Sequence, residues 1–254
     1  MAKERGIFLD QTVRRLTEGS ITKTLVRFAA PYLAANFLQA LYGAVDLLVV
    51  GWFCSSESVS AVSTGAQIMQ IILSLISGLT MGGTILIAQY VGAKRIDQAA
   101  DTISTMFSLF GIISVMMTVV MLACASPLLM LMQTPKEAFG PALDYVLIAS
   151  AGTVFVIGYN AVSAILRGLG DSRHPLIFIA ISCVCNILLD LAAVGLLGMG
   201  AGGAALATII SQGLSFVIAI IYLKRNNFIF DFKRKSFHLH KDKVLSLIKI
   251  GIPV

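Results

Sequence analysis

Charged side chains are scarce in this sequence of 254 residues. Asp, Glu, Lys and Arg make up 13% of the chain, whereas hydrophobic residues make up 57%. A soluble domain carries roughly 25% charged residues. With about half of that share, the chain has too few polar side chains to cover a globule in water. Composition therefore excludes an ordinary soluble domain and predicts an integral membrane protein.

Enzyme signatures are also scarce, and the sequence predicts neither catalysis nor a bound cofactor. There is no Walker motif, which excludes ATP hydrolysis by this chain. The four cysteines fit no metal-binding spacing and are interpreted as small hydrophobic residues. The string Gly168-Leu169-Gly170-Asp171 matches the GxGD of intramembrane aspartyl proteases, but it continues into a polar turn that ends at Pro175. The glycines of Gly198–Gly203 follow no predicted strand, so they indicate a turn and not a nucleotide-binding loop.

Long apolar runs are abundant, and each is long enough to cross a bilayer, which takes roughly 20 apolar residues in a helix. A polar stretch between the second and third runs, Val91–Asp101, is interpreted as a short surface helix. A seventh apolar pattern begins near Val244. The six predicted spans are Phe28–Phe53, Val62–Tyr90, Thr102–Ala125, Ala138–Leu166, Leu176–Leu197 and Ala204–Leu223.

Basic residues are distributed on one side of this topology. Of the 19 Lys and Arg residues, only Lys136 falls in a connection on the opposite side. Because Lys and Arg concentrate in cytoplasmic loops, both ends of the chain are predicted to be cytoplasmic, in a multi-pass protein of the cell's inner membrane. The same rule accounts for the net charge of +6 without nucleic acid. The predicted organisation is a tail (1–24), a six-helix lobe (25–223), a basic cytoplasmic linker (224–243) and the start of a seventh helix (244–254).

The end of the chain repeats a pattern found near its beginning. Leu25–Pro31 and Leu247–Pro253 each run from two apolar residues through a basic residue to a proline. Both copies enter a membrane run from the predicted cytoplasmic side, as in transporters built from parallel repeats. We therefore expect one complete lobe followed by the first turns of a second, and we expect a lone lobe not to alternate access.

Two acidic residues fall deep inside predicted spans, where a charge is costly and needs a reason. Asp46 lies in the first span and Asp190 in the fifth, each surrounded by aliphatic residues. At 1.5 Å per residue, they lie roughly 28 Å and 22 Å from the cytoplasmic ends of their helices, so both belong to the outer half of the membrane.

Polar side chains accompany these aspartates at helical spacing. Gln39 and Tyr42 share the face of Asp46, Asn186 shares that of Asp190, and Thr208 lies at comparable depth in the sixth span. Oxygen ligands of this kind suit Na⁺, and two close carboxylates suit a shared proton. The alternative is that hydrogen bonds between helices satisfy each aspartate separately.

Five segments stand out by their order and spacing, and they include an RG-GD-P turn, an N-D pair and a GAA-ATxxSQ stretch. The segments are Pro31 with Asp46–Gly51, Ala88–Ala93, Leu166–Pro175, Asn186–Asp190 and Gly202–Gln212. Together they resemble the N-terminal half of a multidrug and toxic compound extrusion (MATE) transporter.

The resemblance implies an all-α transmembrane fold of twelve helices in two six-helix lobes, of which this chain is the first lobe plus the start of a seventh helix. It implies export of cationic or amphipathic small molecules in exchange for Na⁺ or H⁺. The family's N-lobe cation site falls on Asp46, Asn186, Asp190 and Thr208, which would be the ligands if the ion is Na⁺. Gln39, Tyr42 and, on the fourth span, Asn160 are the expected cavity or substrate-adjacent residues.

Some alternatives stay open at this point. Pro31 is either a helix boundary or a hinge, because proline frees a backbone carbonyl inside a helix. The expected partners are the bilayer, cationic small molecules and a second lobe, either missing here or supplied by another half. The chain could also belong to a flippase for lipid-linked or oligosaccharide substrates, or be a non-transporting membrane assembly partner. A flippase should have a more cationic central cavity, whereas the deep ionisable residues of this sequence are acidic and favour a cationic cargo.

Overall fold

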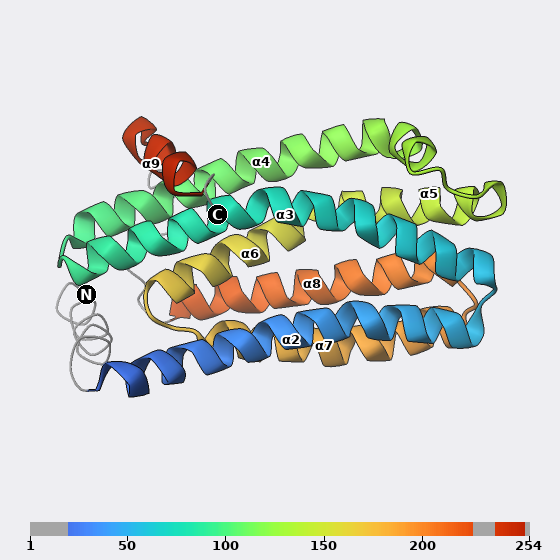
Figure 1. The fold of residues 1–254 in the computed structure, drawn as a ribbon, viewed down its shortest axis with the longest axis horizontal. Coiled ribbons are helices and arrows are strands. Elements are labelled where there is room, and N and C mark those ends of the chain that lie inside the picture. Colours follow the sequence, from blue (N-terminus) through green and yellow to red (C-terminus); the bar gives the residue numbers. More distant parts are fainter. Residues whose placement is uncertain (1–19, 226–236, 252–254) are drawn as a thin grey trace.

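The computed structural model describes residues 20–225 and 237–251, and they form a bundle of long helices that run side by side along its longest axis (Figure 1). No strand occurs among these described residues. The helices are α2 (Ile21–Phe53), α3 (Ser56–Gly92), α4 (Ile96–Leu131), α5 (Lys136–Ala151), α6 (Thr153–Gly168), α7 (Arg173–Asp190), α8 (Gly200–Arg225) and α9 (Lys241–Gly251), with a π-helical segment, η1 (Leu191–Leu196), between α7 and α8.

The six predicted spans are all present as helical segments. Five helices are long and apolar enough to cross a membrane, namely α2, α3, α4, α8 and α7 with its π-helical extension. The remaining span, the fourth in chain order, consists of α5 and α6, which are bent by 49° at Gly152. Glycine is required there because a Cβ on Gly152 would overlap the side chain of Ile209 on α8. The sequence pattern did not predict this bend.

Helix boundaries extend beyond the apolar runs, because a helix continues into the headgroup region where water can hydrate its polar turns. Helix α2 begins at Ile21, inside the predicted tail, of which residues 1–19 lie outside the described part. The predicted surface helix at Val91–Asp101 is wrong. Gly92 ends α3, and α4 begins at Ile96 after a turn in which Lys94 has a positive φ of 59°.

Pro31 lies inside α2, ten residues after its start, and the helix continues through it. The interpretation of Pro31 as a helix boundary is therefore wrong. Its missing amide hydrogen leaves the carbonyl of Arg27 without the usual helical donor. The hinge interpretation stays a prediction.

Large apolar side chains cover the outside of the bundle. On α4, Ile112, Val115 and Val119 are each 60 to 62% exposed and recur at helical spacing. A soluble protein would not expose such a stripe, whereas a lipid-facing surface requires one. The small side chains that allow close helix packing lie inside, where α7 packs on α2 and α8, and α5 and α6 pack on α8.

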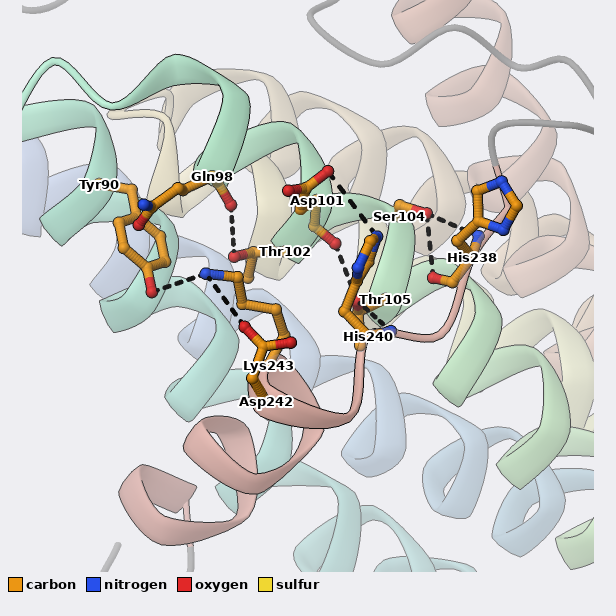
Figure 2. Close-up of polar contacts among 10 residues, drawn as sticks. All are labelled: Tyr90, Gln98, Asp101, Thr102, Ser104, Thr105, His238, His240, Asp242 and Lys243. Carbon is orange, nitrogen blue, oxygen red and sulfur yellow. Dashed lines mark hydrogen bonds and ion pairs between the residues drawn. The ribbon is translucent and has the colours of Figure 1, made fainter.

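Helix α9 and the four residues before it dock on the C-terminal half of α3 and the N-terminal part of α4 (Figure 2). Lys243 donates a hydrogen bond to the Tyr90 hydroxyl at 2.9 Å, and His240 Nε2 lies 3.7 Å from Asp101 Oδ1. Ser104 Oγ accepts from the backbone N–H of His238 at 2.8 Å. The structure describes only part of the predicted linker (224–243) and only part of the repeated pattern at Leu247–Pro253, because residues 226–236 and 252–254 lie outside the described residues.

Candidate functional site

The candidate site lies where α2, α7 and α8 meet. Packing of α2 against α7 brings Asp46 and Asp190 together. Asp46 is only 4% exposed to solvent, and Asp190 is 0% exposed. The backbone changes from α to π geometry directly after Asp190. Such π-helical turns inside α-helices are frequent at functional sites. The two aspartates therefore share one buried position, as the sequence predicted from their depths.

The predicted partners of the pair also assemble here. Thr208 Oγ1, from α8, donates a hydrogen bond to Asp46 Oδ2 at 2.9 Å. The Asp190 carboxyl and the Asn186 side chain are neighbours of the Asp46 carboxyl, although no regular hydrogen bond joins them to it. All four predicted coupling residues thus form one cluster, contributed by three helices.

Several polar atoms of this cluster are buried without a regular hydrogen bond. Within the described chain, no donor reaches Asp46 Oδ1 or either oxygen of Asp190, and both polar atoms of Asn186 lack a partner. Two carboxyl groups that face each other away from water cannot both stay charged without a cation or a proton between them. The arrangement is therefore one that can hold a positive species.

Tyr42 holds the cluster against α8. Its hydroxyl lies 2.7 Å from Ser211 Oγ and 3.1 Å from the carbonyl oxygen of Thr208. Tyr42 is itself only 5% exposed. These contacts fix the position of α2 relative to the helix that supplies Thr208.

A cavity of about 170 Å³ opens on the cluster. Gln39, Tyr42, Asp46 and Thr208 line it, whereas Asn186 and Asp190 are not among its lining residues. Gln39 and Gln70 also line a larger cavity of about 700 Å³ between α2, α3 and α6, so the two spaces adjoin. Of the two aspartates, only Asp46 lines the smaller cavity.

Asn160 lies apart from the cluster. It lines the larger cavity, and its amide donates to the carbonyl of Val156 at 2.8 Å. The structure does not bring Asn160 into contact with the aspartates, in agreement with its sequence position nearer the cytoplasm.

Sequence reasoning missed three residues around the cavities. Gln212 lines the smaller cavity, and its spacing of four from Thr208 was a usable signal. Tyr145, on α5, also lines the smaller cavity. The sequence contains no signal for it, because no charged residue shares its helix face. Arg167 lines the larger cavity, although the sequence pattern predicts only a cytoplasmic loop residue there.

The residues that resemble a protease motif have a local structural role. Asp171 Oδ1 accepts hydrogen bonds from the backbone N–H groups of Arg173 and His174 at the start of α7, each at 3.2 Å. Its other oxygen contacts the His174 ring, which stacks on Tyr222 with centroids 4.2 Å apart. These contacts tie the α6–α7 turn to α8. Within the described residues, no group of three or more His, Cys, Asp or Glu side chains could hold a metal ion.

Comparison with known proteins places this lobe in a family. The family model MatE matches residues 31–192. The chain belongs to the MatE family, whose members are MATE transporters and not enzymes.

Curated relatives carry names of multidrug transporters. The chain is 31% identical over 237 residues to the probable multidrug resistance protein YpnP of Bacillus subtilis, covering 93% of this chain and 53% of the relative. It is 26% identical over 246 residues to the multidrug export protein MepA of Staphylococcus haemolyticus, covering 96% and 54%. The chain therefore spans about half the length of the curated relatives it matches.

Solved structures show the same fold. A crystal structure of MATE in the bent conformation superposes with a TM-score of 0.88 at 26% identity, covering 96% of this chain and 54% of that one. The outward-facing conformation of a multidrug resistance MATE transporter of the MOP superfamily gives a TM-score of 0.86 at 27% identity, covering 95% and 53%. The expected fold, a six-helix MATE lobe, is confirmed.

Proposed function

We propose that this chain forms the N-terminal half of an antiporter that exports cationic or amphipathic small molecules in exchange for Na⁺ or H⁺. Asp46, Asn186, Asp190 and Thr208 form the coupling site, and Gln39 and Tyr42 form the wall between it and the cargo. The proposed location is the inner membrane, with both ends of this chain on the cytoplasmic side. Names of the relatives support small-molecule export, and the buried pair supports the coupling.

One observation carries the coupling proposal. Two carboxyl groups, from α2 and α7, face each other in a buried position where three of their oxygens have no donor within the described chain. Mutual repulsion is strong in such a low-dielectric site. A proton shared between them removes one charge, and a Na⁺ between them offsets both. Either species then binds only as long as the two helices keep the carboxyls together.

The oxygen atoms present fit a Na⁺ site. Both carboxyls, the Asn186 carbonyl and the Thr208 hydroxyl offer the hard ligands that such a cation prefers. Asn186 has no other hydrogen bond in the described chain, so its carbonyl is available to an ion. The same geometry accepts a proton, and both coupling ions stay within the proposal.

Coupling to cargo follows from the position of Asp46 at the end of the smaller cavity. A cationic cargo group in that cavity and the coupling ion both require the negative charge of the pair. Binding of one therefore lowers the affinity for the other, which is the exchange that an antiporter needs.

Exposed polar residues indicate which face of the lobe does not meet lipid. Asn36, Gln39 and Gln70 are exposed on α2 and α3 at membrane depth. Polar groups at this depth face protein or a water-filled cavity. We therefore place a second lobe opposite the polar face of α2 and α3, with the cargo between the two lobes.

Charge-neutral substitutions test this proposal. Asp46→Asn and Asp190→Asn each keep the side chain's shape and remove one charge. In cells that express this lobe together with a second lobe, either variant should lose ion-driven efflux of a cationic dye such as ethidium. Membrane insertion should persist, because a neutral residue is cheaper than a charged one in the bilayer.

Asp144→Asn is the matched control, because Asp144 is an exposed aspartate of α5 that lies outside both cavities. It should export at the parental rate. Parental efflux by both Asp46→Asn and Asp190→Asn under the same ion gradient would mean that the pair is structural.

A further inference from the structure

The larger cavity contains a cation that the coupling proposal does not use. Arg167, in the last turn of α6, is the only charged side chain among the residues that line this cavity of about 700 Å³. It is half-buried, and the six residues before it are fully buried. The carboxylates of the coupling site do not line this cavity.

Among residues 20–225 and 237–251, no acidic side chain pairs with Arg167. Within the described part of the chain it makes no ion pair and no hydrogen bond. Its guanidinium carbon lies 5.2 Å from the centroid of the Tyr32 ring. A guanidinium held over an aromatic face keeps its N–H groups free at the edge. The contact therefore positions the cation without satisfying its hydrogen-bond donors.

Other free donors surround the same space. The side-chain amides of Asn36, Gln39 and Gln70 line the cavity and make no hydrogen bond within the described chain. The serine and threonine hydroxyls of the cavity are already used as donors to helix carbonyls, among them Ser77 to Ser74 at 2.7 Å and Thr80 to Ser77 at 2.8 Å. Free N–H groups and one uncompensated positive charge favour an anionic ligand over a cationic one.

The rest of the wall is apolar. Phe28, Leu73, Ile76, Met81 and Ile85 line the cavity beside the polar groups. A small inorganic anion would leave this surface wetted, whereas a hydrocarbon chain would cover it. Polar and apolar parts together suit an amphipathic ligand.

We propose that Arg167 is the centre of a binding site for the oxyanion head, a carboxylate or phosphate, of an amphipathic molecule. The planar guanidinium binds two oxygens of the head, and the amides of α2 and α3 complete its hydrogen bonds. The site adjoins the coupling pocket through Gln39 and Gln70. It does not depend on ion coupling, so either proposal can fail alone.

The head can belong to a membrane lipid or to a free compound. In both cases the recognised chemistry is the same oxyanion, and the experiment separates the two sources. Decyl phosphate represents the free compound, and phosphatidylglycerol represents the lipid. Decyltrimethylammonium is the cationic control, with the same chain length and opposite charge.

Chemical protection of the unmutated chain gives the most direct test. Phenylglyoxal modifies arginines, and mass spectrometry of the chain in phosphatidylcholine nanodiscs gives the rate at each position. Saturating decyl phosphate should slow the modification of Arg167 at least about tenfold, because the bound phosphate covers the guanidinium. A hydrogen bond to a charged group contributes enough affinity for this occupancy. Decyltrimethylammonium should not, and neither compound should change the rate at Arg173, which is exposed at the start of α7.

Replacing phosphatidylcholine with phosphatidylglycerol identifies the source. Protection by phosphatidylglycerol alone assigns a lipid headgroup, and protection that needs decyl phosphate assigns a free amphipath. An unchanged rate at Arg167 with saturating decyl phosphate and with phosphatidylglycerol would overturn the proposal.

Substitutions give an independent readout. Arg167→Gln should weaken binding of radiolabelled decyl phosphate about tenfold or more. Arg173→Gln removes a charge from the same predicted side of the membrane. It should change the affinity for decyl phosphate less than twofold, because a single exposed charge usually contributes little. Equal losses in the two variants would mean that general surface charge attracts the anion, and the site would be refuted.

Discussion

Thr208 shows how one hydroxyl connects the coupling site to α8. Its Oγ1 donates to Asp46 Oδ2 at 2.9 Å, while its own carbonyl lies 3.1 Å from the Tyr42 hydroxyl. Thr208→Val keeps the size of the side chain and removes only the hydroxyl. A hydrogen bond to a charged group contributes about 1.5–3 kcal/mol, so ion-coupled efflux should fall about tenfold or more.

Thr208→Ser is the control for this change, because it keeps the hydroxyl and loses a methyl group. It should retain most of the parental efflux, measured as the initial rate under a fixed Na⁺ or proton gradient. A Val variant that matches the Ser variant would remove Thr208 from the coupling site.

Asp46 and Asp190 could be predicted because buried charge is rare in membrane helices and stands out in an apolar sequence. Helical spacing added Tyr42 and Asn186, and comparable depth added Thr208. Tyr145 had no such signal, because aromatic residues are ordinary in apolar helices and only the packing of α5 brings it to the cavity. Arg167 was assigned to a loop because charge alone does not tell whether a side chain at a helix end turns inward.

The crossing of α3 and α9 depends on glycine. A Cβ on Gly82 would lie 2.7 Å from the carbonyl oxygen of Leu247 and 3.1 Å from the amide of Gly251. These are backbone atoms, so α9 would have to move. Gly82→Ala should therefore loosen α9, although Gly→Ala inside a helix usually stabilises it by about 0.5–1 kcal/mol.

Hydrogen exchange measures this effect on the described part of α9, Lys241–Gly251. Amides of α9 should exchange faster in Gly82→Ala than in the parent. Gly111→Ala is the control, because Gly111 lies within α4 and a Cβ there meets nothing within 4 Å. Equal protection of α9 in both variants would show that the close crossing does not hold it.

The helices illustrate where sequence patterns stop being informative. Apolar length located all six spans, since the bilayer imposes it. The bend at Gly152 and the π-helical turn after Asp190 arise from contacts between helices, which a linear pattern does not contain. The continuation of α2 through Pro31 is likewise absent from the linear pattern.

The orientation of the whole lobe is a prediction from the distribution of Lys and Arg. Thr134 and Arg95 lie beyond opposite ends of α4, a helix of 36 residues, or roughly 54 Å at 1.5 Å per residue. In a background without the four native cysteines, Thr134→Cys should react with an impermeant thiol reagent added outside intact cells. Arg95→Cys should react only after the membrane is permeabilised.

Gly200 lies on the same predicted outer side as Thr134 but is a poor labelling position, because its φ of +57° strains any other residue. Labelling of Arg95→Cys, and not of Thr134→Cys, in intact cells would reverse the orientation.

The central claim is that the Asp46–Asp190 pair holds one positive species. Infrared difference spectroscopy of the purified chain in lipid tests it directly, because a protonated carboxyl group and a carboxylate absorb in separate bands. We predict a protonated-carboxyl band in Na⁺-free buffer that is absent in Asp190→Asn, or a carboxylate band that shifts when Na⁺ replaces choline and does not shift in that variant. A parent chain that shows neither signal has two ionised, unoccupied carboxylates, which would contradict the account.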